Sequence, residues 1–306
     1  MTAVRFATSG TTGSPVAWLR GEDQLVAETR LLAGLLGGSP DGTDLDAICT
    51  HAPVGHLYGH LLGHRLPALL DVPVRQVPVT EPFDVSGARH PLLVTLPASF
   101  SVLARSLSTL DQCARVTIVF SSAAIPPLAH PVVAALGDRA RLVELFGSTE
   151  TGLVATRVFP TSDWTLAPDV RFVPRLLAAR AGRLAIESPR LAARNSWPAP
   201  AEITLDDEVT VVGANTFRWH GRAGRLVKVN GRRLNLDAVR ATLSAAAPDA
   251  AVRCVPEPDQ VRGEWFTVTV DSADPATLLA VDRAVATLPA WQRPRAVQQT
   301  TAARIS

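Results

Sequence analysis

A run of hydroxyl and glycine residues lies close to the start of the sequence, at Thr8-Ser9-Gly10-Thr11-Thr12-Gly13. Glycines let the backbone approach an anion, and hydroxyls with free backbone N–H groups can surround phosphate oxygens. The segment has neither the Gly-Lys-Ser/Thr end of a P-loop nor the Gly-x-Gly-x-x-Gly pattern of a dinucleotide site. By itself it predicts either a phosphate-binding loop or a flexible turn.

A second candidate segment, Phe146-Gly147-Ser148-Thr149-Glu150-Thr151-Gly152, follows a predicted strand. The ring of Phe146 could stack on a base, a hydroxyl could contact phosphate, and the carboxylate of Glu150 could hold Mg²⁺. The alternative is a turn at a strand end with a solvated glutamate. The segment alone does not decide between the two.

A third segment, from Gly221 to Leu236, carries several arginines, the lysine Lys228 and an Asn230-Gly231 pair. Asn-Gly between apolar runs predicts a hairpin turn. The segment is therefore either a basic hairpin at a domain boundary or part of a binding site.

In this order and at these separations, the three segments resemble the motifs of the adenylate-forming superfamily: acyl-CoA synthetases, aryl-acid ligases and peptide-synthetase adenylation domains. The first resembles the Ser/Thr/Gly phosphate loop. The second resembles the Tyr-Gly-x-Thr-Glu motif, with Phe146 in the aromatic place. The third resembles the Gly-Arg-x-Asp…Lys…Gly segment that opens a mobile C-terminal domain. The resemblance covers nearly the whole chain and looks closest to small ligases of polyketide and aryl-polyene gene clusters.

Further matches extend the resemblance. Ser121-Ser122-Ala123-Ala124 resembles an adenine-contacting turn, and His56-Leu57-Tyr58-Gly59 resembles the wall of the acyl pocket. Asp207 lies fifteen residues before Arg222, where the family places the ribose-binding aspartate, and the adjacent Asp206 is the alternative.

The resemblance implies activation of a small aryl or acyl carboxylate as its acyl-adenylate, with ATP or AMP and Mg²⁺ as cofactors. The acyl group would pass to a thiol, of CoA or a carrier protein, or to an amine, in secondary metabolism. The implied catalytic residues are Thr149, Glu150 and Arg304, with Glu150 also binding the metal. The implied nucleotide-binding residues are Thr8, Ser9, Gly10, Thr11, Thr12, Gly13, Ser122, Ala123, Phe146, Gly147, Ser148, Asp207, Arg222 and Lys228. The implied pocket residues are His56, Tyr58 and Gly59.

The sequence also departs from the family pattern. Only seven residues precede the first loop, so the N-terminal subdomain of the family is expected to be missing. Val16 and Gly224 stand where the family has a lysine and the hinge aspartate, and Arg304 takes the place of the terminal lysine. These departures leave an alternative: a degenerate nucleotide- or acyl-adenylate-binding subunit, or an acyltransferase of the second half-reaction only. A partner subunit or a homodimer would then replace the missing region.

Three histidines, His56, His60 and His64, have helical spacing and would share one face, which is also a zinc-binding pattern. No carboxylate accompanies them, so the expectation is one pocket histidine with two packed or exposed ones. The cysteines Cys49, Cys113 and Cys254 have no metal spacing and are expected in the core.

The elements that must position these residues alternate between strands and helices, which predicts an α/β sheet with parallel pairs. The fold expected is a large α/β domain with a small β-rich subdomain, plus a small mobile α+β C-terminal domain. Helices are predicted at 22–36, 56–70 (which Pro67 ends or kinks), 99–107, 131–136, 236–246 and 274–287. Strands are predicted at 4–7, 47–51, 72–79, 91–95, 116–121, 141–146, 182–187, 208–212, 251–255 and 265–270. The boundaries expected are 1–220 for the nucleotide- and acyl-binding core and 221–306 for the C-terminal domain.

The composition of the 306 residues is that of a globular protein, with 47% hydrophobic and 19% charged residues. A net charge of +2 argues against a nucleic-acid-binding surface. The cysteine pattern, the absence of a signal pattern at the first residues and the lack of a long apolar run predict a cytoplasmic protein without a membrane span.

Overall fold

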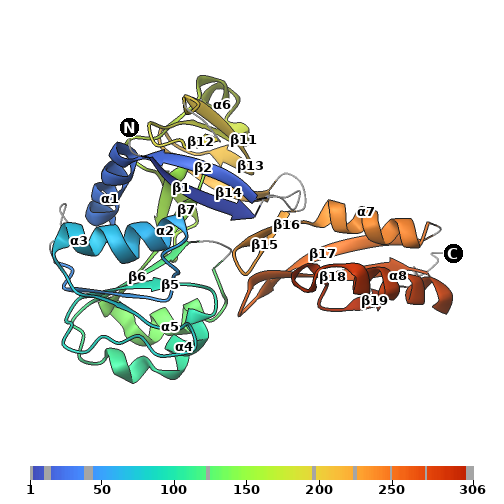
Figure 1. Cartoon of the computed structure of the whole chain (residues 1–306), viewed down its shortest axis with the longest axis horizontal. Coiled ribbons are helices and arrows are strands. Elements are labelled where there is room, and N and C mark those ends of the chain that lie inside the picture. The colour runs from blue at the N-terminus through green and yellow to red at the C-terminus, as the bar shows by residue number, and fades with distance from the viewer. Residues whose placement is uncertain are drawn as a thin grey trace.

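The part of the chain described by the computed structural model forms three β-sheets with helices against them (Figure 1). The described residues are 3–9, 15–37, 44–121, 125–194, 198–222, 226–248, 250–272 and 274–300. The largest sheet has eleven strands, in the order β10-β11-β13-β14-β9-β8-β7-β6-β5-β3-β4. A three-stranded sheet and a five-stranded sheet accompany it.

One half of the large sheet is parallel. It contains β3 (Ala47–Thr50), β4 (Val74–Gln76), β5 (Pro91–Thr95), β6 (Val116–Ser121) and β7 (Ala140–Ser148). Successive residues of β3 face opposite sides, because Ile48 belongs to one hydrophobic core and Cys49 to the other. The near-continuous apolar runs of β5 and β6 follow from this burial on both faces.

Helices cover both faces of the parallel half. On one face lie α1 (Glu22–Leu36) and a helical segment made of α2 (Leu57–His60), η1 (Leu61–Arg65) and α3 (Leu66–Leu70). On the other lie α4 (Ser99–Arg105), η2 (Leu107–Leu110), α5 (Ala129–Leu136) and η3 (Gly137–Arg139) (Figure 1). Pro67 falls in the first turn of α3, where the missing N–H is tolerated, and the preceding turn is π-helical. The proline therefore does not end the helical segment.

The other half of the sheet is antiparallel and contains the predicted β-rich part of the chain. Its strands are β8 (Gly152–Val158), β9 (Asp163–Leu166), β10 (Arg171–Phe172), β11 (Ala181–Glu187), β13 (Glu202–Val211) and β14 (Thr216–Arg222). A short helix, α6 (Pro174–Ala179), precedes β11. These strands continue the same sheet beyond β7, so the strand pairing changes from parallel to antiparallel at β7.

The three-stranded sheet is made from two distant parts of the chain. The hairpin of β1 (Ala3–Ser9) and β2 (Pro15–Gly21) pairs with β12 (Ala193–Arg194). The strand predicted at 4–7 is confirmed, while β2 was not predicted. The hairpin leads directly into α1, whose bounds match the predicted helix.

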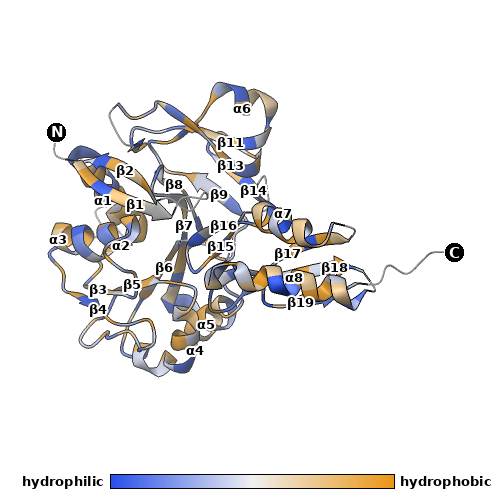
Figure 2. Cartoon of the chain, turned by 45° about the vertical axis from the view of Figure 1, so that its right-hand side comes forward, coloured by the Kyte–Doolittle hydropathy of each residue, from blue (hydrophilic) through white to orange (hydrophobic). Residues whose placement is uncertain are grey.

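The C-terminal residues form their own sheet and core. The strands are β15 (Leu226–Val229), β16 (Arg232–Asn235), β17 (Ala251–Asp259), β18 (Gly263–Asp271) and β19 (Val297–Gln299). Helices α7 (Leu236–Ala246), α8 (Pro275–Thr287) and η4 (Ala290–Gln292) pack against them. Hydrophobic and hydrophilic residues alternate around α7 and α8 in Figure 2. Asn230 and Gly231, with φ of 49° and 77°, make the predicted turn between β15 and β16.

Among the described residues, no helix is long and apolar enough to cross a membrane.

Candidate functional site

The second candidate segment is the tight connection between β7 and β8. Ser148 and Gly152 face each other across the hairpin, so the connection is Thr149-Glu150-Thr151. Gly152 has a φ of 66°, the left-handed conformation that closes a three-residue hairpin loop. The Thr151 hydroxyl oxygen accepts a hydrogen bond of 3.0 Å from the Ser148 N–H and donates one of 2.8 Å to the Gly152 carbonyl. Local hydrogen bonds thus fix the shape of this turn.

Tyr58 packs directly beneath the end of β7. A Cβ atom added to Gly147 would lie 2.7 Å from the Tyr58 hydroxyl and 2.2 Å from the Gly152 carbonyl oxygen, so only glycine fits there. Burial, with the nearby Glu28 carboxylate, raises the pKa of Tyr58 well above its usual value. The structure therefore brings together two of the predicted segments, the one containing Tyr58-Gly59 and the one containing Gly147.

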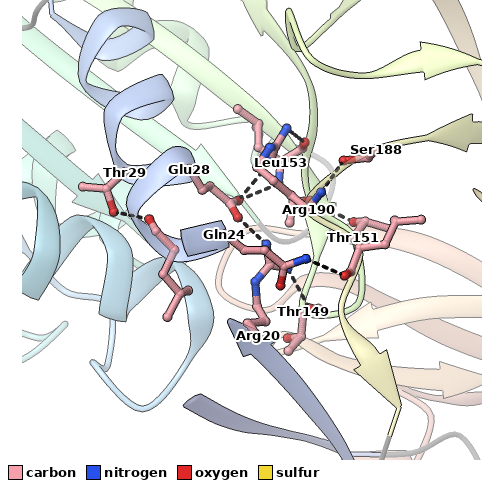
Figure 3. Close-up of polar contacts among 12 residues, drawn as sticks. Arg20, Gln24, Glu28, Thr29, Thr149, Thr151, Leu153, Ser188 and Arg190 are labelled. Carbon is pink, nitrogen blue, oxygen red and sulfur yellow. Dashed lines mark hydrogen bonds and ion pairs between the residues drawn. The ribbon is translucent and has the colours of Figure 1, made fainter. Parts of the chain in front are cut away.

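A buried ion cluster lies under the same turn and was not predicted from the sequence (Figure 3). Its members Arg20, Glu28 and Arg190 are 0%, 0% and 1% exposed. Glu28 is paired with Arg20 at 2.6 Å and lies 3.5 Å from Arg190. One signal could have revealed it: Glu28 sits at helical spacing between Leu25 and Leu32, on the apolar face of α1, where an unpaired charge is not tolerated.

Phe146 belongs to an aromatic group at the carboxyl end of β7. Its ring lies edge-on to Trp164 of β9 at 5.3 Å and to Phe217 of β14 at 5.8 Å. The aromatic group therefore joins the parallel half of the sheet to the antiparallel half.

Asp207 and Arg222 are directly opposite one another on β13 and β14. The Asp207 side chain is 6% exposed and accepts a 2.9 Å hydrogen bond from the indole N–H of Trp219. Its neighbour Asp206 is 57% exposed and lies 3.6 Å from Arg183. The two predicted ribose-binding residues are thus brought together, and Asp207 is the one held in a fixed position.

The predicted pocket segment forms the start of a helix. His56 is exposed and precedes α2, while Gly59 is buried with Pro53 against it. The rings of His60 and His64 are 5.3 Å apart, and burial lowers the pKa of His60. Within the described ranges, no group of three His, Cys, Asp or Glu side chains is arranged to hold a metal ion.

Several predicted residues lie elsewhere or outside the described part of the chain. Thr8 and Ser9 end β1, next to the predicted phosphate loop. Lys228 lies on β15 of the C-terminal sheet, and its backbone N–H donates to the Glu264 carboxylate at 2.7 Å. Gly10, Thr11, Thr12, Gly13, Ser122, Ala123, Gly224 and Arg304 are outside the described residues.

The sequence is similar to curated 4-coumarate–CoA ligases. It is 27% identical to the protein of Halorhodospira halophila over 277 residues, which are 89% of this chain and 65% of that protein. The identity to the Cereibacter sphaeroides protein is 26% over 296 residues, 94% of this chain and again 65% of the relative. The chain therefore spans just under two thirds of the length of these relatives. No family model matches the sequence.

Solved structures share the fold over nearly the whole chain. A malonyl-CoA ligase in a ternary product complex with methylmalonyl-CoA and AMP bound has a TM-score of 0.65 at 22% identity, covering 97% of this chain and 70% of that one. An amide bond synthetase from Marinactinospora thermotolerans has a TM-score of 0.66 at 19% identity, covering 97% and 65%. An NRPS protein containing adenylation and PCP domains has a TM-score of 0.62 at 19% identity, covering 97% and 66%. At these identities the likeness concerns the fold alone.

Proposed function

We propose, from the premise that this chain is a member of the adenylate-forming superfamily, that it activates a small aryl or acyl carboxylate with ATP and Mg²⁺. The observation that carries the proposal is the turn Thr149-Glu150-Thr151, held in one shape at the carboxyl end of β7. Ligands of α/β sheets bind outside the carboxyl ends of the strands. The turn follows the carboxyl end of β7, with Thr149 half-buried and Glu150 7% exposed.

The nucleotide would lie along this edge. Phe146 and the 121–124 turn would contact the adenine, and Asp207 with Arg222 the ribose. Asp207 supports this assignment, because Trp219 fixes one of its carboxylate oxygens. The hydroxyl- and glycine-rich residues 8–13 would surround the phosphates, from the end of the β1–β2 hairpin.

Glu150 is the candidate ligand for Mg²⁺. Magnesium sites in nucleotide-using enzymes need only one or two carboxylates, because water and phosphate oxygens complete the coordination. A single carboxylate beside the Thr149 and Thr151 backbone fits that requirement. Bound Mg²⁺ would neutralise the phosphate charge during transfer.

In the proposed reaction, a carboxylate oxygen of the acid attacks the α-phosphorus of ATP. The bond from that phosphorus to the bridging oxygen breaks, and pyrophosphate leaves with the electron pair. Thr149 would hold an α-phosphate oxygen, and Arg304 would take the position of a lysine near the carboxylate. Because the residues align both reactants, much of the rate increase would come from positioning.

The acyl group would then pass to a thiol or an amine. A malonyl-CoA ligase, an amide bond synthetase and an NRPS protein with adenylation and PCP domains share the fold, which is why both kinds of acceptor are proposed. Residues 221–306 are the part proposed to move between the two half-reactions, and within them residues 226–299 have their own sheet and core.

Exchange of labelled pyrophosphate into ATP, measured with a panel of aryl and short acyl acids, tests the proposal. Exchange should depend on one class of acid and fall at least about 100-fold in Glu150→Ala, as for loss of a charge-stabilising group. Glu81→Ala, at an exposed position on the 77–90 loop, is the control. ATP binding by calorimetry without any exchange would instead favour a nucleotide-binding subunit, and transfer from supplied acyl-AMP would favour an enzyme of the second half-reaction.

A further inference from the structure

We infer that the buried cluster of Glu28, Arg20 and Arg190 is the positioning device of the 149–151 turn, and that it locks this turn to the β1–β2 hairpin. The inference deepens the proposed function, on which its consequence for nucleotide binding rests. Neither the predicted motifs nor the nucleotide-binding residues include any of the three.

Glu28 binds the backbone that follows the turn. One carboxylate oxygen accepts a 2.6 Å hydrogen bond from the Leu153 N–H, and the other accepts a 2.6 Å bond from Arg20. Leu153 is 125 residues away in sequence. The carboxylate therefore ties α1 to the first residues of β8.

Arg20 binds the backbone at the first residue of the turn. It lies on β2, opposite Val4 of β1, and donates a 3.2 Å hydrogen bond to the Thr149 carbonyl. Arg20 and Glu28 together bind the backbone at both ends of the turn. The turn and the β1–β2 hairpin are consequently fixed to one another through this ion pair.

Arg190 completes the cluster from a third direction. Its guanidinium donates at 2.7 Å and 2.8 Å to Asp169 and at 2.7 Å to the Leu153 carbonyl. The backbone of residues 189–192 is also bound at three points. Gln24 of α1 donates to the Pro189 and Leu191 carbonyls at 3.0 Å and 2.9 Å, and the Ala192 N–H donates to the Glu150 carbonyl at 2.8 Å.

Gly152 shows how closely the turn is seated on the cluster. A Cβ atom there would lie 2.5 Å from a Glu28 carboxylate oxygen and 2.6 Å from an Arg20 nitrogen. The ion pair thus occupies the space that a side chain would need. The glycine of the 146–152 motif is required by the cluster as well as by its positive φ.

Burial of these charges is costly, which points to a role beyond stability. A buried ion pair is often no more stabilising than apolar residues of the same volume, and its best-supported use is to fix one arrangement. Here the arrangement fixed is the backbone on either side of Glu150. Loss of the Glu28 charge should therefore weaken Mg²⁺-dependent nucleotide binding. The weakening should be larger than the loss of folding stability alone would cause.

The test compares Glu28→Gln with Glu144→Gln. Glu144 is also a buried carboxylate on the β7–β8 hairpin, 3% exposed and bound by Arg157 at 2.7 Å and 2.9 Å, but it lies away from the turn. In Glu28→Gln, amide exchange at residues 148–153 should accelerate about tenfold more than elsewhere, as expected for loss of hydrogen bonds to a charged group. The Mg²⁺ concentration for half-maximal ATP binding should rise about tenfold. In Glu144→Gln the amide exchange at residues 148–153 and the Mg²⁺ dependence of ATP binding should both match the wild type, whatever the change in melting temperature.

Equal acceleration of exchange in both variants, or an unchanged Mg²⁺ dependence in Glu28→Gln, would overturn the inference. If the wild type binds no ATP, the proposed function fails, and the exchange comparison still decides whether the cluster positions the turn. If Glu28→Gln does not fold, Arg20→Lys serves in its place. Lysine keeps the charge beside Glu28 and cannot reach both Glu28 and the Thr149 carbonyl as a guanidinium does.

Discussion

At the scale of single residues, the neighbouring aspartates Asp206 and Asp207 have different surroundings. Asp207 is buried and bonded to Trp219, whereas Asp206 is exposed and near Arg183. A carboxylate already oriented by a neighbour loses less freedom on binding a ribose hydroxyl. We therefore expect Asp207→Asn to weaken ATP binding about tenfold or more, measured by calorimetry, which corresponds to one charge-assisted hydrogen bond.

Asp206→Asn is the matched control, since it makes the same chemical change one residue away. Its ATP affinity should equal that of the wild type. Equal losses in both variants would remove Asp207 from the nucleotide site and indicate an effect of net charge.

His51 is a buried histidine that the proposed chemistry does not use. Its Nε2 donates to the Glu81 carbonyl at 3.1 Å, and in the neutral ring its Nδ1 accepts from the Ser99 hydroxyl at 2.8 Å. Burial lowers its pKa to about 4. The unfolded chain, with a histidine pKa of about 6.5, then binds a proton that the folded chain does not.

This difference predicts that the free energy of unfolding falls as the pH is lowered from about 6.5 to about 4, by on the order of 3 kcal/mol from this residue. Urea unfolding across that range should show a shallower decline for His51→Gln than for the wild type. His130→Gln, at an exposed position, should keep the wild-type slope. A His51→Gln slope equal to the wild type would show that other groups dominate acid unfolding.

At the scale of elements, the start of α2 depends on a glycine. A Cβ atom at Gly59 would lie 1.9 Å from the Pro53 carbonyl oxygen, whereas one at Gly55 would have no heavy atom within 4 Å. The helix would have to shift to accept a methyl group, and with it Tyr58 beneath the turn. We expect Gly59→Ala to reduce stability by about 1–3 kcal/mol, as for an overpacked core, and Gly55→Ala to change it by less than about 0.5 kcal/mol.

Thermal and urea unfolding of the two alanine variants check this difference. The result would go against the expectation if Gly59→Ala were as stable as Gly55→Ala, because the backbone would then tolerate the shift.

The elements that the sequence predicts best are long periodic runs with strong end signals. The helix Glu22–Leu36, the strands Pro91–Thr95 and Val116–Ser121, and the helix Leu236–Ala246 match their predicted bounds. Asn235 caps the last of these through its side chain, which a sequence pattern can reveal. Short or polar strands were missed, such as β19 (Val297–Gln299), because pairing with β18 rather than local preference makes them strands.

The candidate site was likewise predicted only in part. Motif residues such as Gly147 and Asp207 were identified by their order along the chain. The Arg20–Glu28–Arg190 cluster was not, since Arg190 and Leu153 lie more than a hundred residues from Glu28, and Arg20, eight residues from it, lies on a different element. Only the charge at a core position of α1 indicated that a partner had to exist.

At the scale of the whole molecule, the C-terminal sheet has a core that shares no buried residue with the two cores of the large sheet. Phe266 is fully buried in that core. Truncation to alanine should cost about 3–5 kcal/mol there. In hydrogen exchange of the full chain, Phe266→Ala should reduce protection at 226–299 and leave 91–121 unchanged.

Phe100→Ala, in a core of the large sheet, should have the reverse effect and serves as the control. Equal loss of protection in both regions would show that the two parts unfold together.

The change from parallel to antiparallel strand pairing at β7 has a consequence for the order of folding. Facing residues of β7 and β8, Ser148 and Gly152, are four apart in sequence, whereas those of β6 and β7, Val116 and Ala140, are 24 apart, and those of β3 and β5, Ala47 and Pro91, are 44 apart. The entropy cost of closing a loop rises with its length, so the hairpin can form before its parallel neighbours. The turn that contains Glu150 would then be among the earliest structures on the folding pathway, a template onto which the parallel strands are added.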